Sequence, residues 1–233
     1  MTAAGEPLPQ GEAKVRAVRH MFDAIAPRYD LVNRVMTLRM DVGWRRATVR
    51  SLGLPAGSLV VDVAAGTGDL CRELQTAGYA PVGVDLSWGM LAHARTTAPL
   101  VQADALRLPL PGRSVEGATC GFALRNVADL LAFLAELARV IRPGGRLALL
   151  EVAQPDNRLL RRGHALYFNE VMPRLGALLS DGSAYNYLRR SVAYLPSPAE
   201  LLELLRAAGF PDVERRPLSL GIAQLLTATR GGT

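Results

Sequence analysis

The chain is poor in cysteine, aromatic residues and long apolar runs. Of its 233 residues two are cysteine, 6% are aromatic and one is lysine. Cys71 and Cys120 lie far apart and outside any CxxC pattern, so neither a disulfide framework nor a zinc site is expected, and both are predicted to be buried. No apolar run reaches the ~18 residues of a membrane helix. Residues 1–15 lack the apolar stretch of a secretory signal, so a cytoplasmic protein is expected.

The charge is positive but scattered. The net charge is +6 and arises almost entirely from arginine. The arginines are spread along the chain without interleaved aromatic residues, so nucleic-acid binding is not predicted. The three histidines show no ligand spacing, and no metal is predicted.

The length suits one domain. Residues 1–11 are small and polar and are expected to form a flexible tail. Residues 12–57 contain three stretches of helical periodicity, 12–25, 29–38 and 42–52, and are interpreted as a helical cap. Residues 58–153 are interpreted as a core, 154–197 as an insertion facing the substrate or a membrane, and 198–233 as a final helix and strands.

Short apolar strands alternate with helices in the core. Strands are predicted at 58–63, 80–84, 100–102, 115–120, 146–152, 213–216 and 221–229, and helices at 69–78, 89–96, 129–141 and 198–209. This alternation is typical of an α/β fold, here a Rossmann-like, doubly wound sheet of seven mainly parallel strands. Such sheets bind ligands at the carboxyl ends of their strands.

One strand-to-helix loop has the features of a nucleoside site. Gly66 and Gly68 allow the backbone to approach a ligand, and Asp85 follows the next strand, where a carboxylate can accept hydrogen bonds from a ribose. A dinucleotide loop needs a third glycine, which is missing here. Asp62, Asp85 and Asp104, which follow three successive strands, favour a cationic nucleoside, S-adenosylmethionine, although each acid alone could cap a helix or a turn.

The order of motifs is similar to that of known enzymes. DVAAGTGD, GVDLS, QADA, LPLP and RVIRPGGRL between residues 59 and 152 resemble the class I S-adenosylmethionine-dependent methyltransferases. The segments 22–30, 44–46, FALRNV at 122–127, MPRLG at 172–176, 185–188 and 221–222 resemble the ubiquinone/menaquinone-biosynthesis C-methyltransferase family. Gly121 stands where that family usually has a serine, and 224–226 replaces its usual Ala-Leu-His.

The resemblance implies S-adenosylmethionine as cofactor and S-adenosylhomocysteine as product. The predicted cofactor contacts combine the loop residues above with those that the resemblance implies. They are Asp62, Ala64, Gly66, Thr67, Gly68, Asp85, Leu86, Met90, Asp104, Ala105 and Gly121. It also implies methylation of a ring carbon in a reduced isoprenoid quinone precursor. A different phenolic or polyketide-type acceptor, methylated on carbon or oxygen, and a cofactor-binding protein or non-methylating enzyme of the same fold remain alternatives.

Three residues are expected to act on the acceptor. Arg125 would stabilise a phenolate, because a guanidinium stays charged, with an ion pair as the alternative role. Asn126 would orient the hydroxyl, and Tyr29 would position the substrate. Water, Glu151 or Asp181 would take the proton.

A lipophilic acceptor has to come from a membrane. The cap and residues 154–195, with Arg161, Arg162, Tyr167 and Phe168, are interpreted as a dock for anionic lipid at the inner face of a membrane, with a solvated basic helix face as the alternative. A homodimer through the insertion is a further hypothesis.

Overall fold

The core is a seven-stranded sheet in the order β3-β2-β1-β4-β5-β7-β6. The computed structural model describes residues 10–155, 157 and 191–232. Most of the insertion, with Arg161, Arg162, Tyr167, Phe168 and Asp181, therefore lies outside the described residues. The strands are β1 Leu59–Val63, β2 Ala80–Asp85, β3 Leu100–Gln102, β4 Val115–Gly121, β5 Ile141–Val152, β6 Asp212–Leu218 and β7 Ala223–Thr229. β1 to β5 pair in parallel and β7 pairs antiparallel with β5 and β6, which confirms the predicted Rossmann-like sheet.

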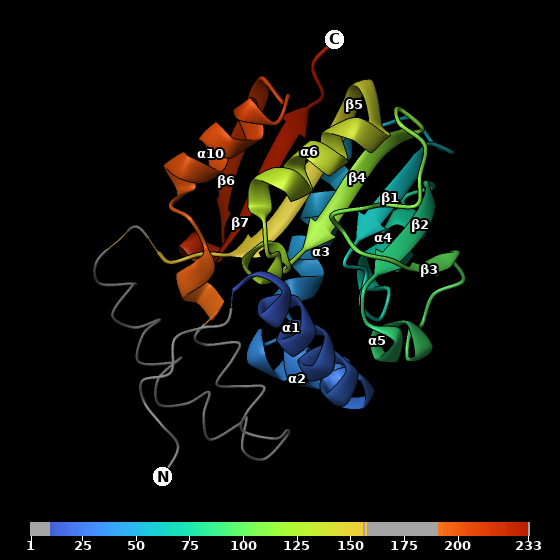
Figure 1. Ribbon diagram of the computed structural model, residues 1–233, viewed down its shortest axis with the longest axis vertical. Helices are drawn as coiled ribbons and strands as arrows, with labels where there is room; N and C mark the ends of the chain where they lie inside the picture. Colours follow the sequence, from blue (N-terminus) through green and yellow to red (C-terminus); the bar gives the residue numbers. More distant parts are fainter. Residues whose placement is uncertain (1–9, 156, 158–190, 233) are drawn as a thin grey trace.

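Helices cover both faces of the sheet (Figure 1). On one face lie α6 (Leu130–Val140) and α10 (Pro198–Ala207), and on the other lie α3 (Met40–Leu52) and α4 (Asp69–Thr76). Because both faces are covered, the central strands are apolar on both, and Val60, Val61 and Val63 of β1 are fully buried. Cys71 and Cys120 are free and buried, as predicted.

A helical cap lies at the carboxyl ends of the parallel strands, as Figure 1 shows. It consists of α1 (Gly11–Ile25), η1 (Ala26–Arg28) and α2 (Tyr29–Met36). The third helix predicted for the cap, α3, instead packs on the sheet, because Val49 and Leu52 are buried against Val60 and Leu225. The remaining described elements are α5 (Trp88–Ala92) and the short helices η2 (Leu124–Asn126), η4 (Val192–Tyr194) and η5 (Ser219–Gly221). Among the described helices none is long and apolar enough to cross a membrane.

Polar contacts fix the cap on the core. Asp23 of α1 accepts hydrogen bonds from the Ser87 hydroxyl at 2.6 Å and the Gly89 N–H at 2.9 Å. These two residues begin α5, so the carboxylate also meets the positive end of that short helix. Lys14 is buried and donates to the Val127 carbonyl at 2.7 Å, with its ammonium 3.8 Å from the centre of the Tyr194 ring. Burial lowers the pKa of Lys14 to about 8.

Several predicted boundaries are wrong. The helix predicted at 89–96 ends at Ala92, because the chain then turns back to the glycine loop, where the Arg95 N–H donates to the Thr67 carbonyl at 3.0 Å. The strand predicted to begin at 146 begins at Ile141. Its pairing with β4 shifts register between Val115 and Gly117, and this irregularity accommodates Pro143 and the two glycines after it within the strand. The first helix begins at Gly11, inside the predicted tail.

Candidate active site

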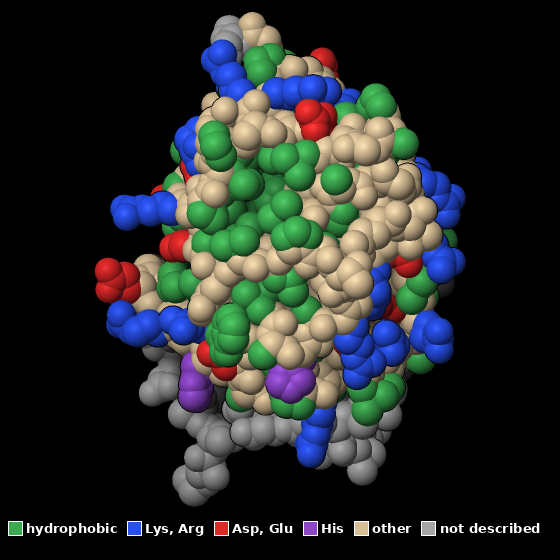
Figure 2. Space-filling view, turned by 90° about the vertical axis from the view of Figure 1, so that its right-hand side faces the viewer, with side chains coloured by type: hydrophobic (Ala, Val, Ile, Leu, Met, Phe, Trp, Pro, Cys, Tyr) green, Lys and Arg blue, Asp and Glu red, His purple; other side chains and the backbone are tan. Residues whose placement is uncertain are grey.

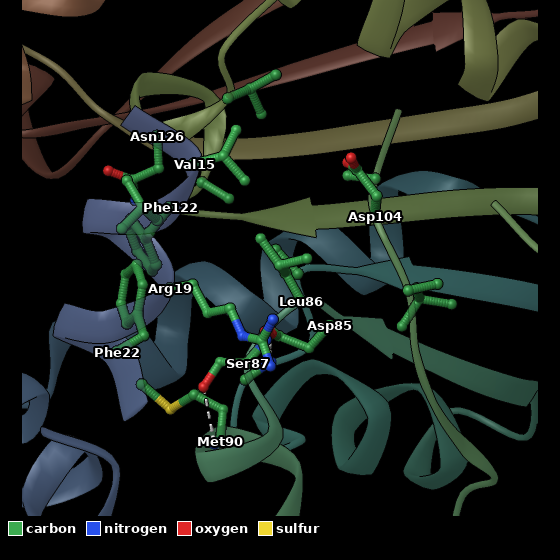
Figure 3. Close-up of a pocket in the computed structure, with 18 of the residues that line it drawn as sticks. Val15, Arg19, Phe22, Asp85, Leu86, Ser87, Met90, Asp104, Phe122 and Asn126 are labelled. Carbon is green, nitrogen blue, oxygen red and sulfur yellow. Dashed lines mark hydrogen bonds between the residues drawn. The ribbon is translucent and has the colours of Figure 1, made fainter. Parts of the chain in front are cut away.

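A cavity opens between the cap and the carboxyl ends of the strands (Figure 3). It encloses about 870 Å³ of space between atoms, part of it open to solvent. On the face shown in Figure 2, hydrophobic side chains gather over the middle, with Lys and Arg toward the edges. The cavity is lined by Val15, Val18, Arg19, Phe22, Tyr29, Ala64, Gly66, Val84, Asp85, Leu86, Ser87, Met90, Ala103, Asp104, Ala105, Leu106, Gly121, Phe122, Ala123, Asn126, Val127 and Ala128.

The glycine loop between β1 and α4 forms one wall. Gly66 and Gly68 have φ values of +56° and +81°, a region that favours glycine. A Cβ at Gly68 would lie 2.6 Å from Cγ2 of Thr96, and one at Gly66 would lie 3.9 Å from the Tyr29 ring. Gly68 therefore serves packing against the segment after α5, whereas Gly66 lies under the ring of Tyr29 at the cavity.

Asp85 ends β2 and points into the cavity (Figure 3). Its carboxylate accepts hydrogen bonds at 2.8 Å from the N–H groups of Gly66 and Ser87. Burial raises the pKa of Asp85 and outweighs these hydrogen bonds. A carboxylate oxygen can accept more than one hydrogen bond, so both oxygens remain able to receive ribose hydroxyls.

The far end of the cavity suits a flat apolar ring. Met90 is buried and Leu86, Ala105 and Leu106 lie with it in the lining. Asp104 lies apart from the other labelled side chains in Figure 3, and its carboxylate accepts the Leu106 N–H at 2.9 Å. Ala105 and Leu106 follow Asp104 directly in the chain, so these apolar lining residues and this carboxylate suit an adenine ring and its amino group. Met90, in contrast, packs with Phe22 and Tyr29 of the cap.

Asp62, Thr67 and Gly68, predicted cofactor contacts, do not line the cavity. Asp62 is 1% exposed and accepts hydrogen bonds from the Thr119 hydroxyl at 2.8 Å and the Cys71 thiol at 3.5 Å. Burial raises the pKa of Asp62 to about 7. The Thr67 hydroxyl donates to Asp30 of α2 at 2.5 Å. Both side chains thus support the loop from behind.

The three predicted catalytic residues occupy different places. Tyr29 and Asn126 line the cavity, and both polar atoms of the Asn126 amide are buried without a hydrogen-bond partner in the part of the chain that the structure describes. Arg125 is 8% exposed, does not line the cavity, and forms an ion pair with the fully buried Glu151. Its Nε is also buried without a partner. The alternative role predicted for Arg125, an ion pair, is therefore present, but the pair is buried and not at the surface.

Glu151 is not free to take a proton in this arrangement. Its carboxylate holds Arg125 and accepts the Val152 N–H at 2.8 Å. Of the other proton acceptors considered from the sequence, Asp181 lies outside the described residues, and water remains a candidate.

Four lining residues of α1 escaped the sequence reasoning as site residues: Val15, Val18, Arg19 and Phe22. Their i, i+3, i+4, i+7 spacing predicts one face of a helix but not what that face covers. In Figure 3, Arg19 extends from α1 toward Asp85 and Ser87. No sequence signal distinguishes this arginine from the others.

The residues of this cavity fit S-adenosylmethionine. Asp85 suits the ribose, the apolar residues beside Asp104 suit the adenine, and Gly66 leaves the loop backbone open toward the ligand. The buried, unpartnered amide of Asn126 lies in the same lining, where a second polar molecule would satisfy it.

Comparisons with known proteins agree with this fit. A model of the ubiE/COQ5 methyltransferase family matches residues 10–230. The chain is 45% identical to demethylmenaquinone methyltransferase of Deinococcus radiodurans, over 96% of this chain and 97% of that protein. It is 41% identical to ubiquinone/menaquinone biosynthesis C-methyltransferase UbiE of Syntrophotalea carbinolica, over 91% and 93%.

A solved structure shares the fold. Haemonchus contortus phosphoethanolamine N-methyltransferase 2 in complex with S-adenosyl-L-methionine superposes with a TM-score of 0.60 at 14% identity, covering 81% of this chain and 52% of that one. Taken with the family match over nearly the whole sequence, the chain belongs to the ubiE/COQ5 methyltransferase family and is an S-adenosylmethionine-dependent methyltransferase.

Proposed function

We propose that the chain methylates a ring carbon of a reduced isoprenoid quinone precursor of the demethylmenaquinol type. The observation that carries the proposal is the unpartnered amide of Asn126, buried in an apolar and aromatic lining with Phe22, Tyr29 and Phe122. Such a lining suits an aromatic ring, and an amide suits the hydroxyl on it. The names of the relatives at 41% and 45% identity support the same acceptor.

The cofactor supplies a methyl group on a sulfonium, and the protein must supply a nucleophilic ring carbon. On methyl transfer to the ring carbon the bound cofactor would become a neutral thioether. The acceptor would give its hydroxyl proton to water as the phenolate forms, and it would regain a hydroxyl when the ring hydrogen leaves as a proton. Asn126 orients the acceptor's hydroxyl, and Tyr29 holds the ring from the cap. Arg125, one residue from Asn126, lies behind the lining and is paired with Glu151, so it would act on the developing phenolate through its charge and not through a direct hydrogen bond.

The test is methyl transfer from isotopically labelled S-adenosylmethionine to a panel of reduced demethylquinones and simple phenols. We expect the label in a quinone ring carbon, detected by mass spectrometry. Label on oxygen, or on a phenol in preference to every quinone, would favour the alternative acceptor class.

Asn126→Ala sharpens this assay. Loss of one positioned donor should lower kcat about 10²-fold. The affinity for S-adenosylhomocysteine, measured by calorimetry, should stay near that of the wild type, because the Asp85 and Met90 end of the cavity is untouched. Stability should not fall, since an unpartnered buried amide contributes none. Equal loss of turnover and cofactor affinity would contradict the assigned role.

We also infer that α2 and the turn after it contact an anionic membrane surface from which the acceptor is drawn. Leu31 and Leu38 are 54% and 67% exposed. Arg28 and Arg39 are exposed and Arg34 is half-buried beside them. Exposed leucines flanked by arginines are typical of a surface that inserts into the headgroup region of an anionic bilayer.

The opposite side of α2 supports this inference. Tyr29 lines the cavity, and Asp30 accepts the hydrogen bond from Thr67 in the glycine loop. A short helix thus has one side at the active site and the other in solvent. Docking through that outer side would bring the membrane next to the cavity.

Co-sedimentation with phosphatidylglycerol and phosphatidylcholine vesicles tests the inference. Binding should prefer phosphatidylglycerol, weaken with salt, and fall in Leu31→Ser/Leu38→Ser. Leu131→Ser is the matched control, because Leu131 on α6 is 47% exposed at a different surface. Equal effects of the two variants would refute docking through α2.

A further inference from the structure

A second cavity lies between α3 and the edge of the sheet formed by β6 and β7. Its space between atoms is about 780 Å³, open solvent included. It shares no lining residue with the cofactor cavity. The cavity is lined by Ala47, Arg50, Ser51, Arg146, Glu214, Arg216, Leu225 and Thr227.

The fold itself creates this hollow. Helix α3 packs against β4, β5 and β7, while β6 is the outermost strand of the sheet. In Figure 1, α3 lies behind the sheet, and β6 lies toward the left edge. The helix therefore forms one wall, β7 supplies the floor through Leu225 and Thr227, and β6 supplies the other wall.

Three arginines from three elements line this cavity. Arg50 comes from the last turn of α3, Arg146 from β5 and Arg216 from β6. Arg146 is held by neutral groups, since it donates to the Thr229 hydroxyl at 2.5 Å and the Ser51 carbonyl at 3.5 Å. Within the described parts of the chain, Arg50 and Arg216 have neither an ion pair nor a side-chain hydrogen bond.

The charge of the cavity is not balanced by the protein. Among the described lining residues Glu214 is the only acid, and it forms no ion pair of 4.0 Å or less with them. Glu214, Arg50 and Arg216 are all exposed, so an anion could reach them from solvent. Three guanidinium groups and one carboxylate leave a net charge of +2. Like charges gathered in one concave site repel each other, and an anion that enters relieves that repulsion.

We propose that this cavity binds a phosphate group. A phosphate monoester carries a charge of about −1.5 to −2 at neutral pH, which matches the excess in the cavity, and the phosphodiester of a lipid headgroup carries about −1 and would offset part of it. Guanidinium groups bind phosphate oxygens through paired N–H donors, and the hydroxyl of Thr227 adds a neutral donor. The group is supplied either by a soluble phosphate or diphosphate or by a phospholipid headgroup.

Calorimetric titration with inorganic phosphate and diphosphate, at constant ionic strength, tests the soluble source. Arg50→Gln and Arg216→Gln should each weaken binding about tenfold. Arg206→Gln is the matched control, because Arg206 is an exposed arginine on α10 without a charged partner among the described residues. It should bind as the wild type does.

Glu214→Gln provides a test of opposite sign. Removing the only acid of the cavity should tighten phosphate binding several-fold, whereas Glu203→Gln on α10 should leave it unchanged. A merely structural role of these side chains predicts no tightening.

A vesicle assay distinguishes the headgroup source. If phosphate and diphosphate do not bind, Arg50→Gln/Arg216→Gln should still reduce co-sedimentation with phosphatidylglycerol vesicles several-fold more than Arg206→Gln does. The proposal is overturned if the Arg50 and Arg216 variants behave like Arg206→Gln toward both the soluble ions and the vesicles. Methyl transfer should be unchanged in every variant, so this result does not depend on the proposed function.

Discussion

Arg125 and Glu151 form a buried ion pair directly beside the residue that we assign to the acceptor. Arg125→Met leaves the Glu151 carboxylate buried and unpaired, which should cost about 3–5 kcal/mol of unfolding free energy. Arg125→Met/Glu151→Met removes both charges and should recover most of that loss. Denaturant unfolding and turnover, measured on both variants, separate two roles of the arginine. If Arg125 stabilises the phenolate, the double variant regains stability but not turnover. A double variant that regains both would make the role of Arg125 structural.

Asp62 gives the stability a pH dependence that can be assigned to one side chain. Burial raises the pKa of Asp62 to about 7, so the folded state favours the protonated acid. Its contribution to stability is therefore complete below the unfolded pKa near 4 and is lost as the pH rises through about 7. Asp62→Asn keeps the shape and does not titrate. Urea unfolding at several pH values measures this. The unfolding free energy of the wild type, minus that of the variant, should fall by about 4 kcal/mol from pH 4 to pH 8. A difference independent of pH would contradict the raised pKa.

The register of the strands explains which of the predicted acids line the cavity. Val63, the last residue of β1, pairs with Val84, so Asp85 projects beyond the end of β1 while Asp62 pairs with Gly83 inside the sheet. Asp62 and Asp85 both follow similar apolar segments, and the amino-acid sequence of one strand does not reveal its register with the next strand. The sequence therefore predicted the cavity's acid at Asp85 and Asp104, but it could not separate them from Asp62, which supports the loop instead.

The elements themselves were more predictable than their contacts. Apolar runs and helical periodicity depend on local sequence, and they predicted every strand of the sheet and the helices of the cap. The α1 face at the cavity depends on contacts far apart in the chain, such as Asp23 with Ser87. Likewise, the pairing of Arg125 with Glu151 joins η2 to β5, and no local pattern indicates it.

Gly89 tests the docking of α1 on α5. A Cβ at this position would lie 2.9 Å from Cα of Asp23, a backbone atom that cannot move alone. Gly89→Ala should therefore displace α1 and weaken binding of S-adenosylhomocysteine about tenfold by calorimetry, because α1 lines the cavity. Gly43→Ala in α3 is the control, since nothing lies within 4 Å of a Cβ there. Alanine at residue 43 should leave affinity unchanged and stabilise the helix slightly. Unchanged affinity in Gly89→Ala would mean that the cap contributes little to the cofactor site.

At the scale of the whole molecule, the cofactor cavity joins two parts of the chain. Its lining comes from α1 and α2 of the cap, from β2 and β4 of the sheet, and from the loops that follow β1 and β3. A ligand there binds both parts only when they are assembled, so it should stabilise them together.

At 100 times its Kd, S-adenosylhomocysteine should raise the unfolding free energy by about 2.7 kcal/mol. Hydrogen exchange should slow over α1 (Gly11–Ile25) and over the loop from Asp85 to Met90, while α10, on the far side of the sheet core, should change little. Asp85→Ala should abolish the stabilisation and the protection of both regions at once. Protection limited to the strand ends, with α1 unchanged, would show that the ligand binds the core alone and that the cap does not close the site.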